Sequence, residues 1–247
     1  MRQFFNNPVT IMLLLFMVYS SVRSGEFCDP VAWFMDKLII LPGIIVGLSF
    51  HEYAHAYVAY RLGDDTPRFQ NRLTVNPARH IDPIGFIALL FVGFGWGRPV
   101  EINPRNFKNM RRDELLVSIA GVTMNLILAA VFAVILGLFI RFSGVTSSTA
   151  LGMETIPQII SSMLYYCIYI NLVLMIFNLL PIPPLDGFNV VTEIFDLRRY
   201  DWWYTVYNYG NIILIALIAF NFTSRIMYPI LVRFMGIFEG IITVIAG

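Results

Sequence analysis

The chain has 247 residues, of which 57% are hydrophobic and only 13% are charged, whereas a soluble domain is typically about 45–50% apolar and about 25% charged. A mean hydropathy of +0.70 excludes a soluble globular enzyme and indicates an integral membrane protein. The net charge of +1 lacks the basic excess expected of a protein that binds nucleic acid, so nucleic acid is excluded as a partner.

Six apolar segments reach or approach the length of about 20 residues that a helix needs to cross a bilayer. They are residues 5–22, 38–60, 114–140, 157–180, 203–222 and 226–245. The first segment also fits a cleaved signal peptide, because Arg2 precedes its apolar run and Ser20, Ser21 and Ser24 are small enough for a cleavage site. We expect an all-α polytopic membrane protein that forms one domain over residues 1–247.

A shorter apolar segment, Pro83 to Gly97, cannot cross the bilayer, because about 15 helical residues extend only about 22 Å against a hydrocarbon thickness of about 30 Å. Its glycines and the flanking prolines favour a loop or hairpin over a helix. We expect this segment to enter the membrane and turn back. Residues 73–75 and 99–102 are β-strand candidates, which predicts a small β-hairpin element at the cytoplasmic face.

The positions of the basic residues favour this re-entrant path, since Lys and Arg collect in cytoplasmic loops. Both flanks of the short segment are rich in arginine, and a re-entrant path leaves both flanks on the cytoplasmic side. Twelve basic residues are then cytoplasmic and only four are outside, with Arg233 inside the last helix. The termini are cytoplasmic on this topology, and the helix of residues 38–60 ends at the cytoplasmic face near Tyr60.

Two of the three histidines lie four residues apart at the end of that helix, in the sequence His51-Glu52-Tyr53-Ala54-His55. Residues i and i+4 share a helix face, so both imidazoles can bind one metal ion while Glu52 lies beside them. Zinc lowers the pKa of a bound water to about 7, and an adjacent carboxylate can accept the proton and pass it to a leaving nitrogen. The pattern predicts zinc-dependent hydrolysis. The alternative is a pair of polar side chains at a helix end that bind no metal.

A catalytic zinc site has three protein ligands and an open fourth position, so one ligand must lie elsewhere in the chain. Asp186 follows a stretch with three prolines that cannot continue a helix, and unwound backbone at membrane depth lines a cavity or is buried in protein. His80 and Glu193 are the other candidates. Without a metal, Asp186 would cap the next helix, His80 would bond to backbone in its loop, and Glu193 would lie on a solvated helix face.

The HExxH helix and the distal Asn178-x-x-Pro181-x-Pro183-Pro184-x-Asp186-Gly187 stretch together resemble the site-2 protease family of intramembrane zinc metalloproteases. The resemblance covers roughly residues 45–190 and points to the compact prokaryotic branch, which has no PDZ or nucleotide-sensing domain. It implies one zinc ion per chain bound by His51, His55 and Asp186, with Glu52 as general base and acid, Asn178 holding the substrate backbone or the oxyanion, and His80 at most accessory. The family's Gly-Pro-x-x-Asn pattern reads Gly121-Val122-Thr123-Met124-Asn125 here.

The resemblance also implies a location in a prokaryotic cell membrane, with transmembrane segments of other proteins as substrates and a regulatory membrane protein as a potential partner. A helical substrate must unwind before it is cut, and we expect the stretch from Phe94 to Val100 to hold it by β-augmentation, unless that stretch is only a structural hairpin. The competing functions are a zinc transporter or metal-sensing protein, which needs ligands but no base, and an inactive scaffold that binds transmembrane segments.

Overall fold

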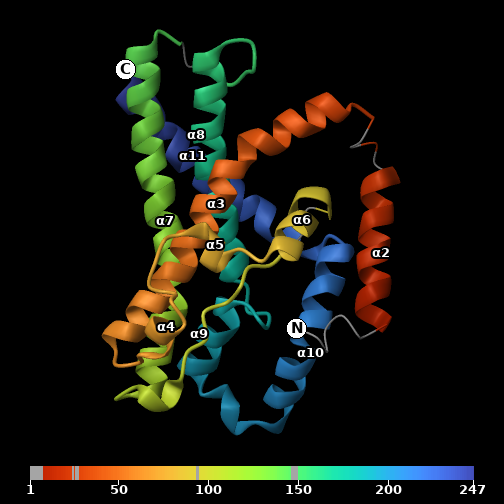
Figure 1. The fold of residues 1–247 in the computed structure, drawn as a ribbon, viewed down its shortest axis with the longest axis vertical. Coiled ribbons are helices and arrows are strands. Elements are labelled where there is room, and N and C mark those ends of the chain that lie inside the picture. The colour runs from red at the N-terminus through yellow and green to blue at the C-terminus, as the bar shows by residue number, and fades with distance from the viewer. Residues whose placement is uncertain (1–7, 24, 26–27, 93–94, 146–149) are drawn as a thin grey trace.

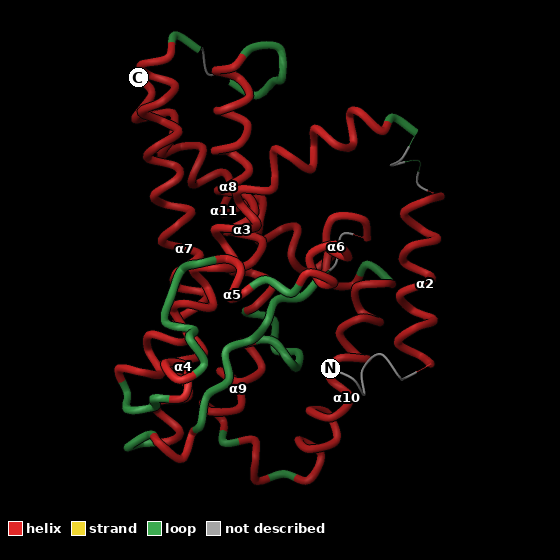
Figure 2. Tube along the Cα trace, viewed as in Figure 1, coloured by secondary structure: helices red, strands yellow, loops and turns green. Residues whose placement is uncertain are grey.

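The computed structural model describes residues 8–23, 25, 28–92, 95–145 and 150–247, and within these ranges the chain forms helices and no named strand (Figures 1 and 2). The helices that are long and apolar enough to cross a membrane are α3 (Pro30–Arg61), α7 (Met110–Ser143), α8 (Ile156–Asn178) and α11 (Phe222–Ala246). The all-α membrane fold is confirmed at this level. Spans in the two remaining predicted segments stay a prediction, because α2 (Pro8–Arg23) and α10 (Asp201–Ala219) do not reach the same length and hydropathy.

Short helices connect these long ones. They are α4 (Thr66–Phe69), α5 (Pro77–His80), α6 (Pro83–Val92), α9 (Asp186–Phe195) and two 3-10 turns, η1 (Pro104–Asn106) and η2 (Leu197–Arg199). Of these elements, α9 matters most for function, because it follows the proline-rich stretch and begins at Asp186.

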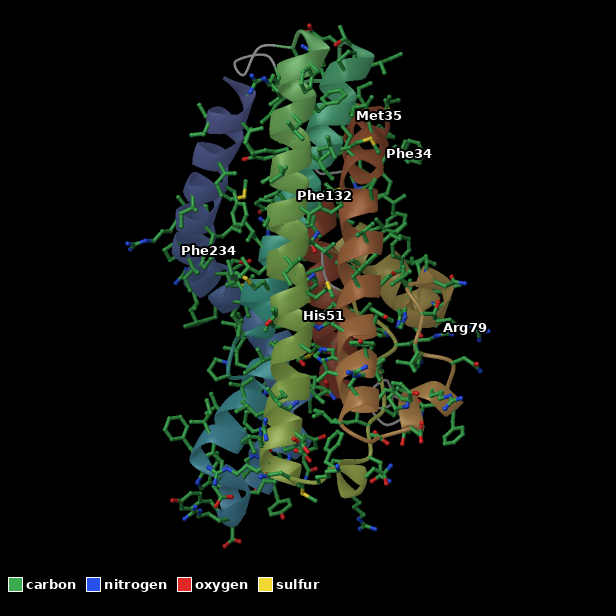
Figure 3. The ribbon with its side chains drawn as sticks, turned by 90° about the vertical axis from the view of Figure 1, so that its left-hand side faces the viewer. Phe34, Met35, His51, Arg79, Phe132 and Phe234 are labelled. Atoms are coloured by element: carbon green, nitrogen blue, oxygen red, sulfur yellow. The ribbon has the colours of Figure 1, made fainter. Side chains whose placement is uncertain are left out.

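Helices α3, α7 and α8 form the centre of the molecule, with α11 packed against α7 and α8 (Figures 1 and 3). Small residues allow the close approach, since Ala129 and Ala133 of α7 are fully buried with Ile168 and Leu172 of α8. A Cβ added at Gly43 of α3 would lie 3.1 Å from the α8 backbone. The C-terminal half of α3, which carries the HExxH sequence, is thereby held against both neighbours.

The prediction of a loop or hairpin from Pro83 onward is wrong for the first ten residues, which form helix α6. The Asp82 side chain accepts hydrogen bonds from the backbone N–H groups of Ile84 and Gly85, each at 3.0 Å, and Pro83 suits the first helical position. This N-terminal cap outweighs the single glycine inside the helix. Phe94, where the expected substrate-binding stretch begins, lies outside the described residues.

The two ends of this segment nevertheless meet, since Ile81 pairs with Gly97 in an isolated antiparallel bridge and the N–H of Arg98 donates to the His80 carbonyl at 2.7 Å. The chain therefore turns back on itself between these residues. Entry of the segment into the bilayer stays a prediction.

The predicted sheet of residues 73–75 and 99–102 is not formed within the described residues. Instead, residues 97–103 run as an extended loop from α6 toward the start of α7 (Figure 2). The loop bonds mainly to side chains: the N–H of Val100 donates to Glu52 at 3.0 Å, and the N–H of Asn103 donates to Asp64 at 2.7 Å. A strand needs a partner backbone, and the loop has side-chain acceptors in its place.

Asp64 anchors the far end of this loop and is fully buried. Its carboxylate accepts hydrogen bonds from the Thr66 N–H and hydroxyl, the Asn103 N–H and the Asn106 amide, at 2.6–3.1 Å. Burial alone raises the pKa of Asp64, but these hydrogen bonds outweigh it and lower the pKa below its ordinary value. The loop is therefore attached at two points, to Glu52 within α3 and to Asp64 just after the end of α3.

Candidate metal centre

The two HExxH histidines lie one turn apart near the cytoplasmic end predicted for α3. His51 is buried inside the helix bundle (Figure 3), and the side chain of His55 is 12% exposed. Their Nε2 atoms are 3.0 Å apart. The i, i+4 spacing therefore brings the two imidazoles to one point, as predicted from helix geometry.

Asp186 reaches the same point from the first turn of α9. Its Oδ2 atom lies 3.2 Å from Nε2 of His51 and 3.2 Å from Nε2 of His55. Gly187 makes this approach possible, because a Cβ there would lie 2.2 Å from the carbonyl oxygen of Leu179 at the end of α8. The proline-rich stretch thus folds α9 back onto α8 and directs Asp186 toward the histidines.

The three atoms have the spacing of ligands around one small cation. Four ligands at about 2.0–2.1 Å from a tetrahedral zinc lie about 3.3 Å from one another, against the 3.0 Å and 3.2 Å observed here. Asp186 Oδ2 is buried and has no hydrogen-bond donor, which is costly for a carboxylate oxygen unless a cation binds it. The donor set therefore fits a divalent metal such as zinc.

The charge of Asp186 is favoured by its surroundings. Burial raises the pKa of its carboxyl, but without a metal the protonated imidazoles of His55 and His51 outweigh this effect and lower the pKa below the ordinary range, and a bound metal cation would replace their positive charge. An ionised carboxylate is the form that can bind a metal.

Glu52 lies beside the cluster and is half-buried, with Oε2 accepting the N–H of Val100 at 3.0 Å. The extended loop of residues 97–103 therefore holds the carboxylate that the sequence predicts to be the general base. Binding of a substrate strand along this loop stays a prediction.

The other two candidate ligands, His80 and Glu193, do not join this cluster. Asn178 is the last residue of α8, and its amide donates to the Leu174 carbonyl at 3.0 Å, the helix-end bond that was the alternative to a substrate role. His80 is fully buried, and its Nε2 lies 2.6 Å from the Thr74 carbonyl oxygen. Glu193 lies at the far end of α9 and forms an ion pair with Arg198 at 2.7 Å.

Glu193 is buried, so the expectation that it lies on a solvated helix face is wrong. Arg198 also pairs with Glu114 of α7, while Arg111 donates to the Glu193 and Ile194 carbonyls at the end of α9. These contacts tie α9 to α7 at the end opposite Asp186. Sequence reasoning missed them because the partners are more than 80 residues apart in the chain.

Folding stability should fall as the pH rises through neutrality because of Glu193. Burial and the nearby Glu114 raise the pKa of Glu193 from 4.5 to about 7, although Arg198 and Arg111 oppose the shift. A carboxyl whose pKa is raised in the folded state stabilises the fold at pH values below its ordinary pKa. This contribution is lost as the pH rises through about 7. We expect Glu193→Gln to flatten the decline in Tm between pH 5 and pH 8, measured by thermal unfolding in detergent.

Glu154→Gln is the matched control, because Glu154 is exposed and carries the same change of charge. A pH profile of Glu193→Gln that matches wild type would contradict this assignment.

Comparison with known proteins agrees with a zinc site at this position. The profile of Peptidase family M50 matches residues 39–220, which run from α3 through α10. The chain is 41% identical over 200 residues to "Putative zinc metalloprotease YwhC" of Bacillus subtilis, covering 80% of this chain and 86% of that protein. No solved structure matches the chain significantly.

A mycobacterial protein is also similar. The chain is 30% identical over 171 residues to "Putative zinc metalloprotease Rip2" of Mycobacterium tuberculosis, covering 67% of this chain and 60% of that protein. The family profile spans well over half of the chain and includes the HExxH helix, the proline-rich stretch and α9. The chain belongs to Peptidase family M50, the site-2 protease family.

Proposed function

We propose that this protein is an intramembrane zinc metalloprotease that hydrolyses peptide bonds within or near the transmembrane segments of other proteins. The observation that carries the proposal is the convergence of three ligand atoms, from His51, His55 and Asp186, within 3.2 Å of one another. The donor set is that of a catalytic zinc site with an open fourth position. Family membership and the names of the relatives support the same reading.

Each residue has a distinct role in the proposed reaction. Zinc, when bound, supplies a Lewis acid that makes water acidic enough to lose a proton near neutral pH. Glu52 accepts that proton at its carboxylate and later gives it to the leaving nitrogen of the cleaved peptide bond. The Val100 N–H orients the Glu52 carboxylate. Asn178 is proposed to hold the substrate backbone or the developing oxyanion.

The position of the cluster supports a proposal for the substrate class. His51 and His55 are carried by α3, a helix long and apolar enough to cross the bilayer, and they face α7, a second such helix. A polypeptide within the membrane would lie close to a site carried by such helices. We propose transmembrane proteins as substrates on this ground together with the family assignment.

The proposed topology has both termini in the cytoplasm and the site near the cytoplasmic face. Exposed arginines gather around the short helices at the end of α3 and the start of α7, as Figure 3 shows for Arg79, and such residues are typical of cytoplasmic loops. Trp202 and Tyr204 are exposed in the first turn of α10, where aromatic side chains commonly mark the membrane interface. The arginines support a cytoplasmic position for this end of the molecule, and the two aromatic side chains support its closeness to a membrane interface.

Zinc content tests the proposal before any substrate is known. We expect near one zinc per chain in detergent-purified wild type and clearly weaker retention in Asp186→Ala, because the carboxylate completes the ligand set. His80→Ala is the control, since His80 is the alternative ligand and is bonded to backbone in this structure. Full retention by Asp186→Ala with loss in His80→Ala would overturn the ligand assignment, and little zinc in wild type would favour an inactive scaffold.

A further inference from the structure

Helix α7 provides none of the three converging ligand atoms, yet one of its faces contacts both histidines. Val117, Gly121 and Asn125 are spaced by four residues and therefore follow one another along the same side of the helix. All three are buried. Each of them contacts an imidazole of the HExxH sequence in a different way.

The two polar contacts go to the Nδ1 atoms of the histidines. Nδ1 of His55 lies 2.7 Å from the carbonyl oxygen of Val117, and Nδ1 of His51 lies 2.6 Å from Oδ1 of Asn125. A carbonyl oxygen can only accept, so His55 must carry a proton on Nδ1. In a neutral imidazole, Nε2 then has a free lone pair, which is the form that binds a metal.

The orientation of the Asn125 amide follows from its other partners. Its Nδ2 group donates to the Gly47 carbonyl at 3.2 Å and to Oδ1 of Asn171 at 2.9 Å. Because the Gly47 carbonyl cannot donate, Nδ2 must face it and Oδ1 must face His51. His51 therefore also donates from Nδ1 and leaves Nε2 free to bind.

Gly121 lies between these two contacts and leaves space for the rings. A Cβ at this position would lie 2.4 Å from Nε2 of His55 and 2.5 Å from Cε1 of His51. Both imidazoles therefore lie directly on the α7 backbone. The Gly-x-x-x-Asn spacing at 121–125 has a physical meaning here, as glycine admits the rings and asparagine, one turn later, orients one of them.

Asn125 is in turn held by a buried network that joins three helices. Asn125 and Asn171 are both fully buried, and the amide of Asn171 donates to the Cys167 carbonyl at 2.8 Å within α8. With Gly47 on α3, the network connects α3, α7 and α8 around His51. A fully satisfied buried network of this kind is rigid, and its loss leaves several polar groups unpaired.

We propose that α7 orients both zinc-binding histidines. In this proposal Asn125 is a positioning residue, which sets the tautomer and ring orientation of His51 so that its Nε2 faces the metal. The inference rests on the proposed zinc function and adds a residue to which no role was assigned from the sequence. Partners that bond to the second nitrogen of a ligating histidine typically change metal affinity by 10–100-fold when they are removed.

Three variants test this role by zinc affinity, measured by competition with a chromophoric chelator on zinc-stripped protein in detergent. Asn125→Leu removes the acceptor at similar volume and should weaken zinc binding by about 10–100-fold. Asn125→Asp keeps an acceptor oxygen for His51 but loses the donations to Gly47 and Asn171, so it should bind zinc more tightly than Asn125→Leu. Thr123→Val is the matched control on α7, because Thr123 is exposed and bonds only to its own helix.

Cobalt absorption gives a second readout, since the visible spectrum of bound Co²⁺ reports the geometry of its ligands. We expect a changed spectrum for Asn125→Leu and a wild-type spectrum for Thr123→Val. If Asn125→Leu does not yield folded protein, Asn125→Ala removes the same oxygen without adding bulk and is judged by the same criterion.

The outcomes separate this inference from the function on which it rests. Failure of wild type to bind zinc would remove the proposed function itself. Zinc binding by wild type with equal affinity in Asn125→Leu would overturn the role of Asn125 alone. Equal losses in Asn125→Asp and Asn125→Leu would also overturn it, because a role in general packing, and not an acceptor for His51, would then account for the effect.

Discussion

Glu52→Gln is expected to abolish peptide-bond hydrolysis while zinc binding remains intact. Glutamine has nearly the same shape and can still accept the Val100 N–H through its amide oxygen, but it cannot take a proton from water. Removal of a general base typically costs about 10²–10⁴-fold in rate. The measurement is cleavage of a model transmembrane segment by purified, reconstituted protein, together with zinc content of the same preparation.

Glu101→Gln is the matched control for this experiment. Glu101 lies next to Val100 on the same extended loop, is exposed, and accepts a hydrogen bond from Gln70 at 2.8 Å and not from the site. We expect it to cleave at the wild-type rate. Cleavage by Glu52→Gln at that rate would falsify the mechanism, and altered zinc affinity or zinc flux in Glu52→Gln would favour a transport site.

The ligands on α3 could be predicted from the sequence because their geometry is local. His51 and His55 depend only on the spacing of one helix, and the structure brings their Nε2 atoms to 3.0 Å. Asp186 was one of three candidates, and the proline-rich backbone around it and the family resemblance distinguished it. In the structure, the close packing of Gly187 against the Leu179 carbonyl allows Asp186 to reach the two histidines. No local sequence pattern predicts that contact.

The contacts that orient the ligands were not predictable in the same way. Asn125 lies 74 residues from His51, so their hydrogen bond depends on how α3 and α7 pack. The Gly-x-x-x-Asn pattern was visible in the sequence, but the physical role of its glycine appears only where the imidazoles contact α7. Glu193 is a similar case, because its burial depends on Arg198 and on Glu114 of a distant helix.

The error at residues 83–97 has a different cause. Glycine and proline were interpreted as breakers throughout the segment, although proline in the first turn of a helix is favourable and Asp82 precedes it as an N-cap. The strand prediction nearby failed because the N–H groups of Val100 and Asn103 donate to the carboxylates of Glu52 and Asp64. β-Branched residues in an extended loop have the same local signal as an edge strand.

Gly121→Ala should disrupt zinc binding more than removal of any orienting hydrogen bond. The added methyl would overlap both imidazoles, at 2.4 Å from His55 and 2.5 Å from His51, and the rings are held in place by their contacts to Asn125 and the Val117 carbonyl. Since both ligands must shift together, we expect a loss of zinc affinity of about 100-fold or more, at the upper end of effects outside the ligand set. The measurement is chelator competition on zinc-stripped protein.

Gly236→Ala provides the control, because it makes the same substitution inside a helix where a Cβ meets nothing within 4 Å. Alanine is favoured over glycine in a helix by roughly 0.5–1 kcal/mol, so this variant should bind zinc normally and unfold at the same or a higher temperature. The helix preference applies equally to Gly121→Ala, and any loss of affinity there must therefore come from contact with the histidines. Wild-type zinc affinity in Gly121→Ala would mean that the rings do not lie on α7 as described. The proposal that α7 orients both histidines would then be wrong.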